Sequence, residues 1–321
     1  MSKFKKRITL LFFIIIFIFV IFNKYIRFYT SISVELLKLN KELATVSSNF
    51  YSNPTDEISY KDIVYKKRGD LDLTLDIYSS KKEVEGGSPV ILYVFGNCWM
   101  YGDKTIPSEL IPLINILREQ GFTIICTSYE LLKSEAIFDK QVSDIKDTVR
   151  WINKNKDIYN FDIDNIGIIA PSAGAQLSML AAYSDNNLFC DDEDLAKYPS
   201  KINYVIDLFG PSELNKVNIS AAPKEIVSKL NDYNMDEISE LYSPINYVKE
   251  DLPDTLIIHS EIDNIVPYNT SLELYNKAIN FNNNFKFISL KSCTHYLENL
   301  SISESVILYF NILNYIFLKS F

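Results

Sequence analysis

The chain has 321 residues, of which 47% are hydrophobic and 23% are charged. This composition is that of a globular protein, so wholesale disorder and fibrous repeats are excluded, and the length suits one large α/β domain or two small ones. Residues 1–28 hold six Lys and Arg and no acidic residue, which leaves 26 Lys and Arg against 41 Asp and Glu in the rest. A body this acidic repels phosphate backbones, so we expect no binding to nucleic acid.

The N-terminal segment, residues 1–28, is predicted to be an uncleaved membrane anchor. A basic stretch precedes an unbroken apolar run over residues 8–22, which extends to residue 28 if Lys24 and Arg27 reach the interface. A helix over residues 8–28 is about 31 Å long, enough to cross a bilayer core of about 30 Å. The alternative is a cleaved signal peptide, but no small-x-small cleavage site follows closely. The positive-inside rule predicts a single-pass membrane protein with a cytoplasmic N-terminus and an extracytoplasmic body.

Residues 29–57 are predicted to form a stalk or docking helix followed by a linker. Apolar side chains recur there at spacings of three and four, which is the pattern of one helical stripe. The stripe either packs on the body, which we favour, or pairs with a neighbouring molecule in an assembly. Its members are Ile32, Leu36, Leu39, Leu43 and Val46.

The body, residues 58–321, alternates predicted strands and helices. The pattern indicates an α/β fold with a mostly parallel sheet and helices on both faces, preceded by a hairpin over 58–68 and 71–78. Residues 211–250 interrupt the alternation with polar, proline-containing sequence and predict a cap-like insertion. Further strands are expected at 89–95, 122–129, 165–170, 202–209, 255–259 and 285–290, and helices at 105–120, 138–157, 173–183 and 301–318.

A candidate nucleophile lies between the strand ending at Ala170 and the next helix. The sequence there is Ala-Pro-Ser-Ala-Gly, in which Ser172 is flanked by small residues that allow a strand and a helix to cross closely. A serine on such a sharp turn stands above the sheet at a helix N-terminus, where backbone N–H groups stabilise an anion. The alternative is an ordinary N-capping serine.

A nucleophilic serine needs a base, and the chain has only two histidines, His259 and His295. His295 lies after the last predicted strand, on a loop before the final helix, where a base belongs. His259 ends its own strand and is expected to support the loop that follows. With two histidines and four widely spaced cysteines (Cys98, Cys126, Cys190 and Cys293), we expect no zinc site. Acyl transfer by a serine with a histidine base needs no metal or organic cofactor, so we expect none.

The third member of such a site is an acid that orients the base. Asp263 is the preferred candidate and Glu261 the weaker one, both on the loop after the strand over 255–259. The order Ser–Asp–His is the one expected for this strand–turn–helix elbow. The alternative for Asp263 is a capping carboxylate for the helix predicted from Tyr268.

These motifs give the chain a resemblance to the α/β-hydrolases of the esterase/lipase superfamily. It most resembles the hormone-sensitive-lipase-like and bacterial feruloyl-esterase-like carboxylesterases, from about residue 60 to the C-terminus. The resemblance implies an α/β-hydrolase fold and a catalytic triad of Ser172, Asp263 and His295. It is carried by residues 73–78 (LTLDIY), 90–104 (VILYVFGNCWMYGDK), 144–175, 207–214 (DLFGPSEL), 259–267 and His295.

The oxyanion loop departs from the family pattern. The family's His-Gly-Gly-Gly-Trp falls on Phe95-Gly-Asn-Cys-Trp99. By this resemblance, the backbone N–H groups of Asn97 and Cys98, together with that of Ala173, form the oxyanion hole. Because Gly permits positive φ and close approach, its replacement predicts a reshaped hole, a narrower substrate range or weaker activity.

The function predicted from these features is that of a serine carboxylesterase that hydrolyses small acyl esters through an acyl-enzyme. Two alternatives remain: an acyltransferase on the same triad, and a membrane-tethered binding protein that has lost turnover. The expected partners are a small ester and a membrane contacted through residues 8–28. The candidate pocket residues, with ordinary packing as their alternative role, are Trp99, Met100, Tyr101 and Phe209.

Overall fold

The computed structural model describes residues 57–320 except 134–136, 222–223, 231–232, 296 and 298–299, together with Phe12, Ile26, Tyr29, Thr30, Ser33 and Val34. The chain divides into two compact units, Met1–Phe50 and Tyr51–Phe321. The second unit contains the complete sheet and all the predicted site residues.

The predicted membrane anchor lies almost entirely outside the described residues. Among the residues that are described, no helix combines the length and the apolar character needed to cross a bilayer. The anchor over residues 8–28, the stalk over 29–57 and the orientation derived from them therefore stay predictions.

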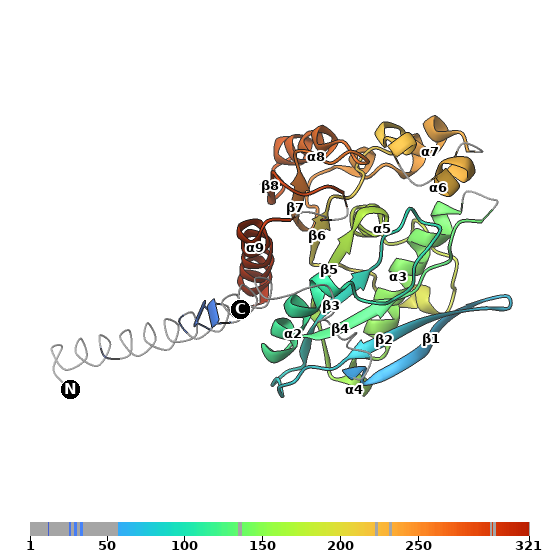
Figure 1. Ribbon diagram of the computed structural model, residues 1–321. Helices are drawn as coiled ribbons and strands as arrows, with labels where there is room; N and C mark the ends of the chain where they lie inside the picture. Colours follow the sequence, from blue (N-terminus) through green and yellow to red (C-terminus); the bar gives the residue numbers. More distant parts are fainter. Residues whose placement is uncertain are drawn as a thin grey trace, which may run out of the picture. The chain divides into compact units, whose positions relative to one another are not determined.

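An eight-stranded sheet forms the centre of the described part of the second unit, in the order β1-β2-β4-β3-β5-β6-β7-β8 (Figure 1). Strand β2 pairs antiparallel with both β1 and β4, and every other pairing is parallel, as the sequence predicts. The strands are β1 Tyr60–Arg68, β2 Leu71–Tyr78, β3 Ser88–Val94, β4 Thr123–Thr127, β5 Phe161–Pro171, β6 Tyr204–Leu208, β7 Asp254–Ser260 and β8 Phe285–Leu290.

Helices cover both faces of the sheet (Figure 1). On one face α2 contacts α9, and on the other α3 packs against α5. Because the central strands are apolar along their whole length, β3 and β4 are buried at every residue, as strands covered on both faces must be. The main helices are α2 Ile111–Glu119, α3 Phe138–Lys154, α4 Lys156–Tyr159, α5 Ser172–Tyr183, α8 Tyr268–Asn280 and α9 Ile302–Ser320.

Most element boundaries fall close to the predicted ones, and the exceptions have local causes. The helix predicted from residue 105 starts instead with a short 3₁₀ turn, Ser108–Leu110, because Pro107 holds an extended ψ of 143°. The helix predicted over 138–157 is divided at Asn155 into α3 and α4. Strand β5 is longer than predicted and begins at Phe161.

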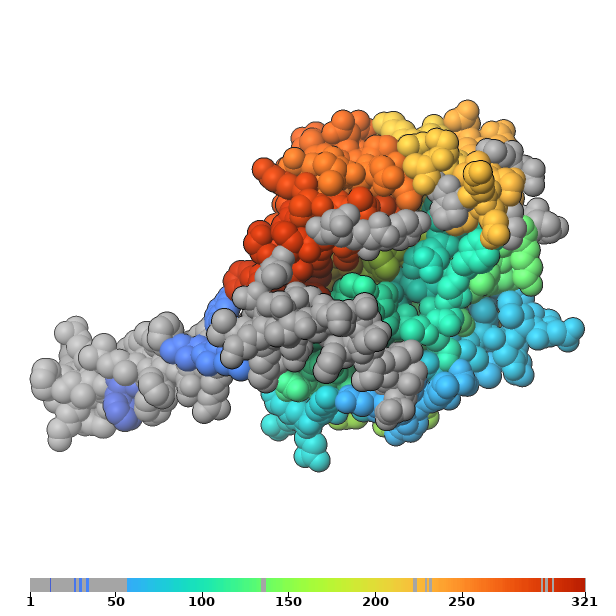
Figure 2. All heavy atoms as spheres, viewed as in Figure 1, coloured from blue at the N-terminus to red at the C-terminus, as the bar shows by residue number. Residues whose placement is uncertain are grey.

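The segment over 211–250 contains short helices rather than strands, and Figure 2 shows it next to α8. Lys216 forms an ion pair with Glu273 of α8 at 2.8 Å, and Asn218 donates to the carbonyl of Asn264 at 3.0 Å. The segment is thereby tied to the loop that follows β7. Its elements are η4 Leu214–Lys216, η5 Ile219–Ala221, α6 Lys224–Leu230, α7 Met235–Tyr242 and η6 Pro244–Tyr247.

Candidate active site

Ser172 occupies a tight turn between β5 and α5. Its φ is +51°, in the left-handed region that non-glycine residues rarely adopt. The turn is possible because the neighbours are small: a Cβ on Gly174 would lie 2.3 Å from the carbonyl oxygen of Val94, and one on Gly96 would lie 2.8 Å from that of Pro171. The close crossing of strand and helix predicted from the sequence is therefore present, and it presents Ser172 at the carboxyl end of the sheet.

His295 and Asp263 extend a hydrogen-bonded chain from this serine. Ser172 Oγ lies 2.7 Å from His295 Nε2, and His295 Nδ1 lies 2.7 Å from Asp263 Oδ2. Asp263 comes from the loop after β7 and His295 from the loop after β8. The structure thus brings together the three residues that the sequence singled out. Glu261, the weaker candidate, is exposed.

Asp263 is held by three hydrogen bonds and lies against a second imidazole. Its Oδ1 accepts the backbone N–H groups of Ile265 and Val266, each at 2.9 Å. Its Oδ2 accepts from His295 and lies 3.2 Å from His259 Nε2. Burial alone raises the pKa of Asp263, but the hydrogen bonds from the two imidazoles outweigh it and hold the pKa well below its usual range. The carboxylate therefore stays ionised and oriented toward His295.

The loop after β3 reverses through three consecutive residues in left-handed conformation. Asn97, Cys98 and Trp99 have φ of 70°, 54° and 63°. L-residues therefore adopt the backbone for which the family pattern uses glycine, and Asn tolerates this conformation best of the three. Burial raises the pKa of the Cys98 thiol to about 11, so the thiol is neutral and not a competing nucleophile.

Tyr129 braces this loop, and the sequence analysis did not identify it. The Tyr129 ring stacks on Phe95 with centroids 4.3 Å apart, and its hydroxyl donates to the carbonyls of Phe95 and Gly96, each at 3.1 Å. Phe95 stands where the family pattern has His. The only signal in the sequence was an aromatic residue at the end of a predicted strand, which is too common to indicate this role.

The candidate oxyanion donors have no competing acceptor in the described part of the chain. The backbone N–H groups of Asn97 and Cys98 donate to no described acceptor, whereas the Asn97 carbonyl accepts from Met100 and Tyr101. Ala173 is the second residue of α5, where a backbone N–H has no partner within the helix. These three backbone N–H groups therefore remain the candidate oxyanion donors.

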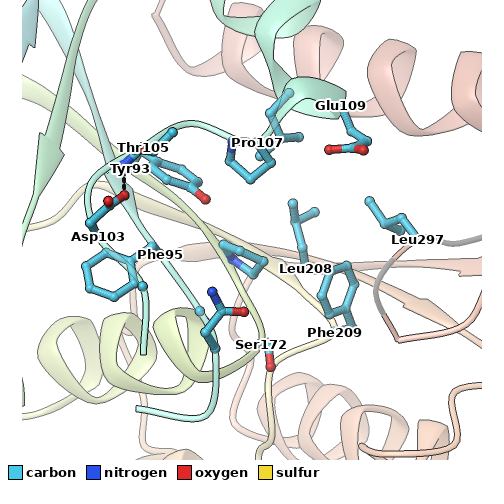
Figure 3. Close-up of a pocket in the computed structure, with 15 residues that line it drawn as sticks. Tyr93, Phe95, Asp103, Thr105, Pro107, Glu109, Ser172, Leu208, Phe209 and Leu297 are labelled. Atoms are coloured by element: carbon cyan, nitrogen blue, oxygen red, sulfur yellow. Dashed lines mark hydrogen bonds between the residues drawn. The ribbon is translucent and has the colours of Figure 1, made fainter. Parts of the chain in front are cut away.

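A cavity of about 360 Å³ opens beside Ser172 (Figure 3). Its described wall is mostly apolar, and it contains the carboxylates of Asp103 and Glu109 but no lysine, arginine or histidine. Most of this wall was not predictable from the sequence, because residues 105–110 were expected to be part of a helix, whereas they form an irregular stretch and a short 3₁₀ turn. The residues that line it are Tyr93, Phe95, Gly96, Asn97, Gly102, Asp103, Thr105, Pro107, Glu109, Leu110, Pro171, Ser172, Leu208, Phe209 and Leu297.

Only one of the four predicted pocket residues lines this cavity. Phe209 does so, and its ring meets His295 edge-on with centroids 5.1 Å apart. Trp99, Met100 and Tyr101 are not among the residues that line it. Trp99 is buried between helices, where its Nε1 donates to Gln176 of α5 at 2.8 Å. Met100 is also buried, while Tyr101 is on the surface.

The segment over 211–250 adds none of its described residues to the cavity wall. It instead contacts the helix that carries Ser172, because Gln176 donates to the carbonyl of Tyr242 at 2.8 Å. Of the residues that the structure describes, no group of three or more His, Cys, Asp or Glu side chains is placed to hold a metal ion.

Curated relatives match just under two thirds of the chain. Esterase LipQ of Mycobacterium tuberculosis is 29% identical over 213 residues, which cover 64% of this chain and 49% of that protein. Esterase LipC of the same organism is 23% identical over 204 residues, which cover 60% and 49%. The chain therefore spans about half the length of these relatives.

Solved structures share the fold over most of the chain. A truncated carbohydrate esterase from gut microbiota superposes with a TM-score of 0.68 at 25% identity and covers 84% of this chain and 99% of that one. Butyrate-bound esterase 2 of Thermogutta terrifontis gives a TM-score of 0.66 at 20% identity, with coverage of 83% and 98%. The model of the BD-FAE family matches residues 75–278, more than half of the chain. The chain belongs to the BD-FAE family, within the hormone-sensitive-lipase-like α/β-hydrolases.

Proposed function

We propose that this protein is a serine carboxylesterase that hydrolyses small acyl esters through an acyl-enzyme. The observation that carries the proposal is the chain of two 2.7 Å contacts from Ser172 through His295 to Asp263, at the mouth of the cavity. His295 takes the Ser172 proton as Oγ attacks the ester carbonyl, and then protonates the departing alcohol. Water, activated by the same imidazole, releases the acid and restores the serine.

Asp263 has two roles in this mechanism. Its hydrogen bond to Nδ1 selects the tautomer of His295 that presents an unprotonated Nε2 to Ser172. Its negative charge stabilises the imidazolium that forms during attack. Because the carboxylate is held by donors on both oxygens, it supplies this charge without reorientation.

The oxyanion is stabilised by backbone N–H groups rather than by side chains. The available N–H groups of Asn97, Cys98 and Ala173 support this assignment. Because every non-proline residue has a backbone N–H group, replacing glycine in this loop keeps the number of donors. The replacement instead changes the shape of the oxyanion hole. Loss of one such donor typically lowers the rate by about a hundredfold or more, so three intact donors favour turnover over a binding-only role.

The cavity favours short, uncharged acyl groups. A volume of about 360 Å³ with apolar walls accepts a small acyl chain, and its described wall offers no cation to bind a charged one. We expect the alcohol part to leave through the open side of the cavity.

The test is hydrolysis of p-nitrophenyl acetate and butyrate by the full chain. We expect Ser172→Ala to lose at least about a thousandfold in kcat/KM, because the nucleophile is removed. Asp263→Asn also loses activity, because the neutral amide no longer selects the productive His295 tautomer.

Ser178→Ala is the matched control for Ser172→Ala. Ser178 is a fully buried serine of the same helix whose hydroxyl has no hydrogen-bond partner among the described residues. We expect it to keep wild-type rates. Equal rates for wild type and Ser172→Ala, with both folded, would contradict the proposal.

A further inference from the structure

The buried carboxylate of the candidate triad contacts two histidines rather than one. His259 ends β7, is fully buried, and its Nε2 lies 3.2 Å from Asp263 Oδ2. The same nitrogen lies 3.0 Å from the carbonyl oxygen of Val266. Both neighbours are acceptors, so Nε2 carries the proton. On the other side of the ring, Ser271 Oγ lies 2.8 Å from Nδ1 and donates to it.

We propose that His259 is a positioning residue of this site: its Nε2–H draws negative charge from Asp263 and thereby sets the pH at which His295 accepts a proton. The inference deepens the proposed function and rests on it. Asp263 Oδ2 faces both imidazoles, so the negative charge that the Nε2–H of His259 stabilises is not available to stabilise a protonated His295. Without the His259 donor, the carboxylate attracts the His295 imidazolium more strongly.

The groups that face His259 come from three elements. Asp263 is on the loop that follows its own strand, and Ser271 and Tyr268 come from α8, the Tyr268 ring meeting the imidazole edge-on with centroids 6.0 Å apart. Asp207 of β6 is the third: burial raises its pKa to about 7, and the charge of His259 opposes that rise. Because replacing His259 changes the surroundings of Asp207, the variants are also compared in an Asp207→Asn background, in which this group does not titrate.

Two substitutions of His259 distinguish the role of its Nε2–H donor from that of the rest of the imidazole ring. The amide of Asn overlaps the position of Nδ1, so His259→Asn keeps the contact with Ser271 and removes the donor to Asp263. The amide of Gln overlaps the position of Nε2, so His259→Gln restores that donor. A role limited to packing predicts similar behaviour for both variants, whereas the positioning role predicts opposite outcomes.

The chain has only two histidines, so NMR of the full protein labelled with ¹⁵N-histidine resolves each imidazole. In wild type we expect His259 to show the Nε2–H tautomer. In His259→Asn, we expect the protonation midpoint of His295 to rise by about half a pH unit or more, a threefold or greater gain in proton affinity. The acid limb of kcat/KM for p-nitrophenyl butyrate moves to higher pH by the same amount. His259→Gln returns both to within about 0.2 unit of wild type.

Further variants keep the inference falsifiable if His259→Asn does not fold. Ser271→Ala retains the imidazole but removes the donor to Nδ1, which weakens Nε2–H as a donor, so we expect a smaller shift of the same sign. Tyr268→Phe keeps the packed ring and is the control, with no shift expected. An unchanged or lowered midpoint in folded His259→Asn, or in Ser271→Ala if only that variant folds, would overturn the inference.

The NMR readout does not require turnover, so the two proposals fail separately. If wild type is inactive but the His295 midpoint shifts in His259→Asn, the esterase proposal is contradicted and the positioning role stands. If wild type has Ser172-dependent activity but the His295 midpoint does not shift in His259→Asn, the positioning role is contradicted and the esterase proposal stands.

Discussion

Three consecutive residues, Asn97, Cys98 and Trp99, hold left-handed backbone although none is glycine. Left-handed conformation costs an L-residue roughly 1 to 2 kcal/mol, so surrounding contacts must keep the loop in place. Trp99 supplies them: its Nε1 donates to Gln176, and its carbonyl accepts from Gln141 at 3.1 Å. The strained loop is thus held in place by hydrogen bonds to α5 and α3.

Asp207 makes stability depend on pH. It is fully buried, its Oδ1 accepts the N–H of Gly210 at 2.7 Å, and its Oδ2 has no partner among the described residues. Burial raises the pKa of Asp207 to about 7, above its unfolded value of about 4. Between these values the folded state holds a proton that the unfolded state has lost, so the free energy of unfolding falls as pH rises toward 7 and levels off above it.

We predict that Asp207→Asn removes this dependence, since the amide oxygen still accepts from Gly210 and nothing titrates. In urea unfolding between pH 5 and pH 8, wild type should lose about 2 to 3 kcal/mol relative to the variant. Parallel curves for the two proteins would show that Asp207 is ionised throughout.

At the scale of elements, buried ion pairs connect β1 to α3. Lys66 is almost completely buried, and its Nζ lies 2.8 Å from Asp144 and 2.6 Å from Asp147, with Asp191 also in contact. Asp144 and Asp147 are fully buried residues of α3, a helix that the sequence predicts by its apolar positions, whereas Asp191 comes from the loop after α5. Removing one partner of a buried pair leaves an uncompensated charge, which is more costly than losing an exposed pair.

We predict that Lys66→Met lowers the free energy of unfolding by about 3 to 5 kcal/mol. Lys67→Met is the matched control, because Lys67 is the next residue, is largely exposed, and pairs with Asp72 at 3.1 Å. Its loss should cost less than about 1 kcal/mol. The measurement is urea unfolding of wild type and the two variants. Equal losses of unfolding free energy in Lys66→Met and Lys67→Met would contradict this account of the β1–α3 contact.

The elements themselves were predictable from sequence because their patterns are strong. Apolar runs marked β3 and β4, and the antiparallel hairpin followed from a short Gly-containing turn. The buried charges of α3 were not predictable. A charged residue in a predicted helix is expected to face solvent unless its partner on another element is known.

At the scale of the whole molecule, the alternation of strands and helices determines where the chemistry lies. Parallel strands bring their carboxyl ends to one edge, so the loops after β3, β5, β7 and β8 meet there, although 200 residues separate the first from the last. Order along the chain was therefore enough to predict Ser172, Asp263 and His295. The cavity wall was not predictable, because it depends on how an irregular loop folds back over the sheet.

Covalent labelling tests the central claim, a serine activated by a histidine, most directly. The full chain is treated with a fluorophosphonate and followed by intact mass and peptide mapping. We predict one adduct per chain on Ser172, none in Ser172→Ala, and labelling at least about a hundredfold slower in His295→Asn, because the base is lost. Labelling of Ser172→Ala at the wild-type rate, or a folded wild type that takes up no adduct, would contradict the account.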